Sequence, residues 1–242
     1  MLLSRSFLIA LLLTLFTLSE TNAQSISEGS RSEALMNVQN YFQNTIGEDA
    51  HIFTGREYLG YAAFIKGHPF FLTDQMQQCE IFYDGTLYEN IPLLFDIVSQ
   101  KIVINRYNQN DTISLLNAKI KYFVLQGHRF ENLSFSEGNE EIIRQGIYDI
   151  LLAGKVNLLV KRIKNIRDGL KATDPVSFVE EDEFFVKRGK DLIQVYSKNS
   201  VLEALNDKSN LVKIFARKNH FRFKKNIEKE LLQTVAYYFK LN

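Results

Sequence analysis

Residues 79–88 read Cys-Glu-Ile-Phe-Tyr-Asp-Gly-Thr-Leu-Tyr, and this pattern is typical of a β-hairpin. Two runs rich in β-branched and aromatic residues flank the pair Asp84-Gly85. Such a pair between such runs is a strong signal for a β-hairpin, because a two-residue turn needs backbone angles that Gly and Asp tolerate. The stretch therefore predicts two antiparallel strands joined at Asp84-Gly85.

Four further turns divide the chain between residues 101 and 196 in the same way. They are 108–111, Gln126-Gly127, Ala153-Gly154 and Arg188-Gly189-Lys190. Strands joined by such short turns must be antiparallel, because a parallel pair needs a crossover of about a dozen residues or more. The period of two over residues 52–196 therefore predicts an antiparallel meander. Long strands with one polar face favour a curved sheet, a roll or a half-barrel.

A short amphipathic helix is predicted before the strands, over residues 32–44. Leu35, Val38 and Phe42 recur there at helical spacing, and Ser32 is a plausible N-cap. Together with the strands and the helical tail described next, this helix predicts a β-rich α+β fold.

Three helices are predicted after residue 197. Ser200 and Glu203 match a capping box for the first, while Asp207 and Asn226 can cap the second and third. The third carries an apolar stripe formed by Ile227, Leu231, Val235 and Tyr238. Such stripes normally pack on the core of the same protein. Residues 198–242 are therefore predicted to be a helical segment on the same body as residues 24–197.

The first 23 residues have the features of a signal peptide. Arg5 supplies the positive charge, residues 7–18 the apolar region, and Thr21-Asn22-Ala23 the cleavage site. The apolar region is shorter than the ~20 residues of a transmembrane helix. Since the only cysteine lies far downstream, no lipid anchor is expected. We predict cleavage after Ala23 and an exported, periplasmic or secreted protein.

Charge is balanced overall but unevenly distributed. The chain has 29 Lys and Arg against 28 Asp and Glu, and this balance argues against a nucleic-acid binder on electrostatic grounds. Residues 24–154 carry a net charge of −7, and residues 155–225 a net charge of +8. The segments 155–167 and 217–225 are therefore candidate contacts for an acidic partner or anionic lipid headgroups. Two solvated faces that offset one another are the simpler interpretation.

Candidate catalytic and metal-binding residues are few. The four histidines show no metal-binding spacing, and His68 and His128 each follow a Gly at a predicted turn. The acidic runs 180–183 and 108–111 lack the register of a calcium loop. Cys79 alternates with Ile81 and Tyr83 like a buried strand residue. We therefore expect that the protein is not an enzyme and that it has no catalytic, cofactor-binding or metal-binding residues.

Aromatic residues are abundant, with 11 Tyr and 19 Phe but no Trp. Clusters occur at 58–61, 69–71, 81–83 and 184–185. Such residues either form the core or line a cavity, and the core is the commoner role.

Several segments resemble an uncharacterised family of exported proteins of Bacteroidetes-type bacteria. They are 46–48, 54–58, 65–71, 82–88, 92–96, 146–155 and 237–239. The family has no assigned activity, so the resemblance implies export and a single body, and no functional residue.

The sequence favours an exported, non-catalytic protein that binds a ligand or another envelope component, and its aromatic content points to an apolar ligand. Two alternatives stay open. A carboxylate-dependent hydrolase of envelope polysaccharide would need two Asp or Glu side chains facing each other across a cleft. An adhesion or scaffold module would dock through its separated charges. No cofactor, no nucleic-acid partner and no membrane span after removal of the signal peptide are expected.

Overall fold

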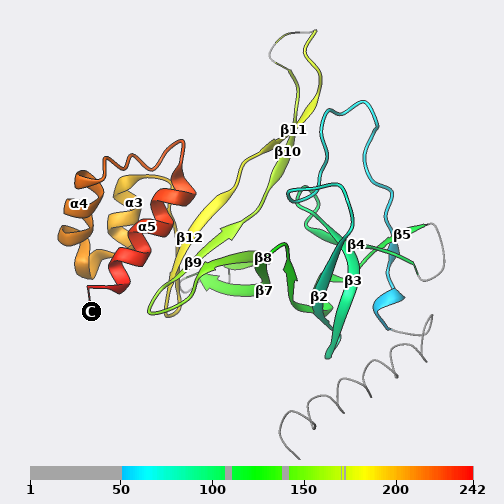
Figure 1. Cartoon of the computed structure of the whole chain (residues 1–242), viewed down its shortest axis with the longest axis horizontal. Coiled ribbons are helices and arrows are strands. Elements are labelled where there is room, and N and C mark those ends of the chain that lie inside the picture. Colours follow the sequence, from blue (N-terminus) through cyan, green and yellow to red (C-terminus); the bar gives the residue numbers. More distant parts are fainter. Residues whose placement is uncertain (1–50, 107–110, 138–141, 170, 172, 242) are drawn as a thin grey trace, which may run out of the picture. The chain divides into compact units, whose positions relative to one another are not determined.

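The computed structural model describes residues 51–106, 111–137, 142–169, 171 and 173–241 (Figure 1). The predicted signal peptide and the helix predicted over residues 32–44 lie outside the described residues, as does most of the turn at 108–111. All described residues belong to one compact unit, Glu48–Asn242.

Thirteen strands are present in this described part, and eleven of them form one open antiparallel sheet. The eleven are β1 (Arg56–Glu57), β2 (Gln77–Tyr83), β3 (Thr86–Asp96), β4 (Lys101–Asn105), β5 (Thr112–Ser114), β6 (Ile120–Leu125), β7 (His128–Glu137), β8 (Ile142–Leu152), β9 (Asn157–Lys161), β12 (Glu183–Arg188) and β13 (Asp191–Gln194). The remaining pair is β10 (Lys164–Arg167) with β11 (Ser177–Glu180). The predicted β-rich, antiparallel character is confirmed.

All five predicted hairpins have their two strands paired, but the sheet is not a simple meander. Its order is β1-β5-β4-β3-β2-β6-β7-β8-β9-β12-β13, so β6 lies beside β2 and not beside β5. Residues 115–119 alone connect β5 to β6, and part of this link is a 3₁₀ turn, Asn117–Lys119. In this order β5 and β6 are four strand spacings apart, which is about 19 Å in a flat sheet. A five-residue link spans this distance only when it is fully extended. The strands from β5 to β6 must therefore curl.

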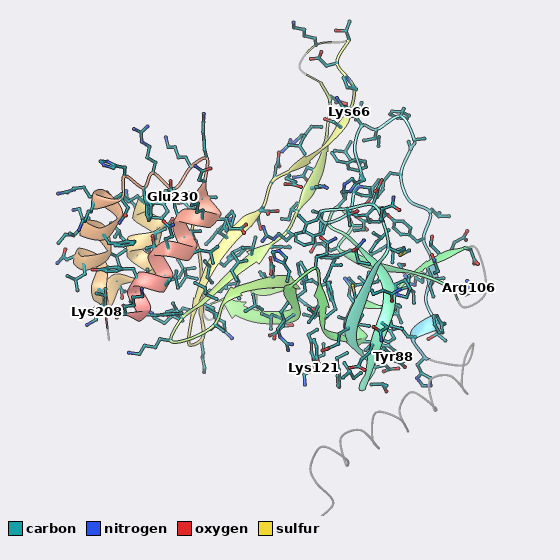
Figure 2. All side chains as sticks on the ribbon, viewed as in Figure 1. Lys66, Tyr88, Arg106, Lys121, Lys208 and Glu230 are labelled. Atoms are coloured by element: carbon teal, nitrogen blue, oxygen red, sulfur yellow. The ribbon has the colours of Figure 1, made fainter. Side chains whose placement is uncertain are left out.

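One long hairpin leaves the main sheet and continues as the two-stranded extension. β9 and β10 follow one another along one arm, and β11 and β12 along the other (Figure 1). The ladder is interrupted between the pairs Lys161↔Glu183 and Lys164↔Glu180. The backbone of Lys66 (labelled in Figure 2) lies beside β11. Its amide donates to the carbonyl of Val176 at 2.9 Å, and its carbonyl accepts from the amide of Phe178 at 3.1 Å.

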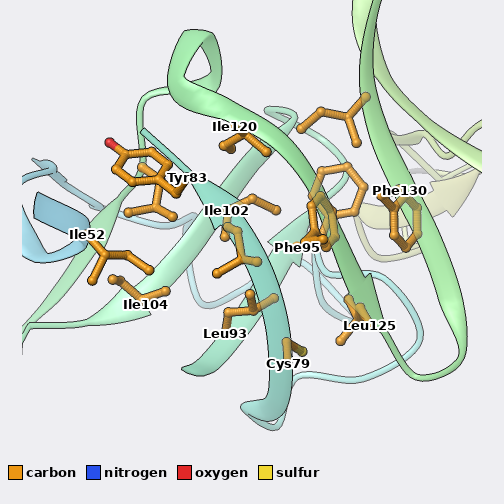
Figure 3. Packing of buried hydrophobic residues seen from close by; sticks show 14 of the residues in the cluster. Ile52, Cys79, Tyr83, Leu93, Phe95, Ile102, Ile104, Ile120, Leu125 and Phe130 are labelled. Atoms are coloured by element: carbon orange, nitrogen blue, oxygen red, sulfur yellow. The ribbon is translucent and has the colours of Figure 1, made fainter. Parts of the chain in front are cut away.

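Side chains from β2 to β7 fill a first hydrophobic core. Phe95, Phe123 and Phe130 contact one another with ring centroids 4.8 to 5.4 Å apart. Figure 3 shows Tyr83, Leu93 and other buried side chains of this core between the strands. Aromatic side chains of the strands thus form part of this core.

A second core joins the sheet to the C-terminal helices α3 (Lys198–Ala204), α4 (Ser209–Lys218) and α5 (Ile227–Phe239). It contains strand residues such as Leu158 and Val186 together with helix residues such as Val201, Val212 and Val235. No helix in the described residues is both long and apolar enough to cross a membrane.

Two of the three helix starts differ from the predicted ones, whereas Asn226 is the N-cap residue of α5 as predicted, although its side chain makes no capping hydrogen bond. The capping box of α3 is formed by Ser197 and Ser200, so the start predicted at Ser200 is wrong by three residues. Asp207 does not cap α4; its carboxylate accepts from the hydroxyl of Tyr238 and from Arg188. The local sequence pattern predicts the Asp207 side chain as a helix N-cap. In the structure it instead bonds to residues that are distant in sequence.

Candidate functional site

Asp96 is the buried polar centre of the candidate site. It ends β3, and its relative exposure is 0%. Its Oδ1 accepts from the backbone amides of Val98 at 2.9 Å and Ser99 at 3.0 Å, which is the pattern of an Asx turn. Its Oδ2 accepts from the hydroxyls of Tyr58 and Tyr61, both at 3.0 Å, and from Ser99 Oγ at 2.5 Å. A carboxylate can be buried when it is hydrogen-bonded in this way.

The two tyrosines keep their protons over the physiological range. Burial, reinforced by the charge of Asp96, raises the pKa of Tyr58 far above its ordinary value. Burial likewise raises the pKa of Tyr61 to about 12. Both hydroxyls therefore remain donors to Asp96, and this fixes the position of both rings.

The rings of Tyr58 and Tyr61 line a pocket of about 280 Å³, which we call the tyrosine pocket. Tyr61 contacts Phe178 of β11 edge-to-face at 5.4 Å, and Tyr58 contacts Phe70 at 6.2 Å. The other lining residues are Gly60, Ala62, Ala63, Ile65, Gly67, His68, Pro69 and Asp74. Most of the lining residues are thus aromatic or small, and nearly half of the surface that they expose in the pocket is polar.

His68 lies stacked on Phe70, with ring centroids 6.3 Å apart. Burial and the nearby charge of Lys164 lower its pKa, so the imidazole is neutral at pH 7. The Lys164 side chain is buried, and its Nζ donates to the carbonyls of His68 at 3.2 Å and Phe70 at 2.7 Å. These bonds fix the backbone of the pocket wall from behind.

Large apolar side chains stand exposed on the same segment. Leu59 is 85% exposed and Phe64 is 74% exposed, and both are sequence neighbours of pocket-lining residues. On the extension, Ile166 and Val179 are exposed as well. Exposed apolar surface beside a pocket is typical of a binding site.

A second polar cluster forms where the long hairpin interrupts its ladder. Arg162 is buried, and its Nη1 donates to Asp182 at 2.7 Å and to Glu228 of α5 at 2.6 Å. Its Nε and Nη2 donate to Asp149 Oδ2 at 2.9 and 2.6 Å. The same oxygen also binds His128 Nδ1 at 2.8 Å. One guanidinium therefore joins β8, the hairpin and α5.

Asp182 and Glu228 also line an open groove of about 600 Å³. Glycoside hydrolysis requires two carboxyl groups separated so that both can reach the substrate. Here both carboxylates bind the same nitrogen of Arg162, which makes them structural partners of that cation. Asp182 and Glu228 are therefore not a free carboxylate pair of the kind that the hydrolase alternative requires.

No protein-family model, curated protein or solved structure matches this chain. The resemblance noted from the sequence therefore stays a prediction.

The residues singled out from the sequence have various roles in the structure. His68 lines the tyrosine pocket, whereas His128 binds Asp149. In the acidic run, Glu181 pairs with Arg167 and Asp182 with Arg162. No cluster of three or more His, Cys, Asp or Glu residues that could hold a metal ion occurs within the described ranges.

Asp96 and the Arg162 cluster were not identified from the sequence. A signal existed for Asp96, because an Asp after an apolar strand and three residues before a Ser is typical of an Asx turn. For Arg162, its neighbours Lys161 and Lys164 suggested a solvated face. Arg162 and Lys164 are in fact buried. Their partners come from segments distant in sequence, so the local pattern could not show this burial.

Cys79 is expected to resist alkylation in the folded protein. It is 3% exposed, and burial raises the pKa of its thiol to about 11. Folding thus favours the thiol, and this contribution to stability is complete below about pH 9 and lost as the pH rises through 11. At pH 8 the thiolate is about one hundredth as abundant as in a free cysteine. Iodoacetamide labelling should therefore be at least ~100-fold slower in buffer than in urea, and equal rates would contradict the buried site.

Proposed function

We propose that this chain is an exported, non-catalytic binding protein that takes one aromatic ring or a short apolar group into the tyrosine pocket. The observation that carries the proposal is the pair Tyr58 and Tyr61, whose hydroxyls are held by the buried Asp96 while their rings line the pocket.

The size of the pocket supports a small apolar group. Pockets for drug-sized ligands occupy roughly 300–1,000 Å³, and a dry cavity of about 150 Å³ already binds benzene. The tyrosine pocket, at about 280 Å³, is larger than that benzene cavity and just below the range for drug-sized ligands. It suits one ring or the end of an apolar chain better than a whole lipid.

The rigidity of the pocket supports binding as well. Tyr58 and Tyr61 are fixed through Asp96, and the opposite wall is fixed through Lys164. A wall that is already ordered loses little conformational entropy when a ligand enters. Neutral His68 and the carboxylate of Asp74 can give the ligand its orientation through hydrogen bonds.

A titration with N-phenyl-1-naphthylamine, a neutral aromatic fluorophore, tests the proposal on the full chain. We expect a saturable rise in fluorescence for the wild type. Ala63→Phe should weaken binding at least tenfold, because Ala63 is exposed on the pocket wall and a ring there fills the pocket.

The matched control is Ala153→Phe, which adds the same ring at an exposed position in the β8–β9 turn. This variant should bind like the wild type. If the two variants bind equally, or if the wild type shows no saturable signal, the tyrosine pocket is not the binding site for such groups.

A further inference from the structure

The outward side of α4 combines positive charge with exposed apolar side chains. Lys213, Arg217 and Lys218 are exposed, and so are Leu211, which precedes them and is 43% exposed, and Ile214, which is 61% exposed. Arg222, exposed in the loop before α5, adds a fourth positive charge. We call these six residues the basic face.

The basic face lacks acidic neighbours along the chain. From Ser209 to Ile227 there are six Lys and Arg residues and no Asp or Glu. Within the described part of the chain, none of Lys213, Arg217, Lys218 and Arg222 forms a salt bridge. Lys224 and Lys225 line the grooves beside Asp182, so they are not counted in this face.

The helix that carries this face is fixed from behind. Val212 and Ala216 are buried in the second core, and Phe215 stacks on Tyr237 of α5 at 4.1 Å. The positive charges of Arg217 and Lys218 also lie in the last turn, where the helix dipole favours cations. The face is therefore a stable part of the fold.

We propose that the basic face docks on an anionic lipid surface. Cations next to a membrane are attracted by acidic headgroups, while aliphatic side chains between them enter the boundary of the acyl region. Leu211 and Ile214 are separated by three positions, so they lie on the same side of the helix and can enter together. Two exposed aliphatic side chains among cations on one side of a single helix are the pattern of a helix that lies at a membrane surface.

Co-sedimentation of the full chain with vesicles tests this docking. We expect binding to vesicles of phosphatidylcholine with 30% phosphatidylglycerol, at least tenfold weaker binding to pure phosphatidylcholine, and loss of binding at high salt. Each cation near the surface contributes about fivefold in affinity. Arg217→Glu with Lys218→Glu should therefore reduce binding by more than 25-fold.

The matched control is Lys101→Glu with Lys190→Glu, which changes the net charge equally at exposed positions outside the face. It should retain most of the binding. Leu211→Ser with Ile214→Ser should also weaken vesicle binding at least fivefold. If that variant binds vesicles like the wild type, or if all variants bind equally, the lipid proposal fails. Salt-sensitive binding to soluble polyglutamate that matches vesicle binding would indicate an acidic macromolecule instead.

Discussion

Replacement of Arg162 by Met is expected to lower the free energy of unfolding by about 3–5 kcal/mol. Arg162 is buried and donates to the carboxylates of Asp149, Asp182 and Glu228. Met fills much of the volume but offers no donor, so Asp149 would be left buried with His128 as its remaining side-chain partner. An uncompensated buried charge is among the most destabilising consequences of a single substitution.

Urea unfolding followed by circular dichroism measures this loss. Arg162→Lys should give an intermediate value, because it keeps the charge but cannot reproduce the planar fork of donors. Arg167→Met is the matched control, since Arg167 pairs with Glu181 at the surface and should contribute little. A loss below about 1 kcal/mol for Arg162→Met would show that the cluster contributes little to the stability of the fold.

Asp96→Ala is expected to lower the free energy of unfolding by about 3–4 kcal/mol and to abolish binding in the tyrosine pocket. The carboxylate accepts from two backbone amides and three hydroxyls, and the substitution leaves these donors unpaired. Tyr58 and Tyr61 also lose the group that orients their rings. The pocket should therefore become disordered even where the sheet stays folded.

Asp96→Asn separates the two effects. The amide keeps an acceptor for the Asx turn but turns donors towards the tyrosine hydroxyls, so stability should fall less than in Asp96→Ala, while fluorophore binding is still lost. Asp111→Ala, at a surface ion pair with Arg106, is the control. Normal fluorophore binding by folded Asp96→Ala would show that the pocket does not depend on this carboxylate.

The strands were predictable because their turns are encoded locally. Asp84-Gly85 and Gly127 adopt the positive φ angles that their residue types favour, and each turn joins neighbouring strands. The position of β6 beside β2 was not predictable, because no local feature distinguishes it from pairing with β5. The burial of Cys79 followed from simple alternation and is confirmed.

The candidate site was less predictable than the fold. The aromatic residues at 58–61 and 69–71 were noted, yet alternation could not show which of them become core and which line a pocket. Phe71 is buried in the first core, whereas Tyr58 and Phe70 line the pocket. The difference depends on Asp96 and on Phe178, which lie about 30 and 110 residues away from this segment.

The β1 edge of the eleven-stranded sheet affects how readily the protein aggregates at high concentration. An exposed edge strand offers unpaired backbone groups to which a second chain can add, and this is a common route to aggregation. At one end, β1 is only two residues long, and both of them, Arg56 and Glu57, are exposed and charged. Such a short, charged strand is a poor template for another strand. A sheet of this width can therefore remain open at β1 with little tendency to propagate from one molecule to the next.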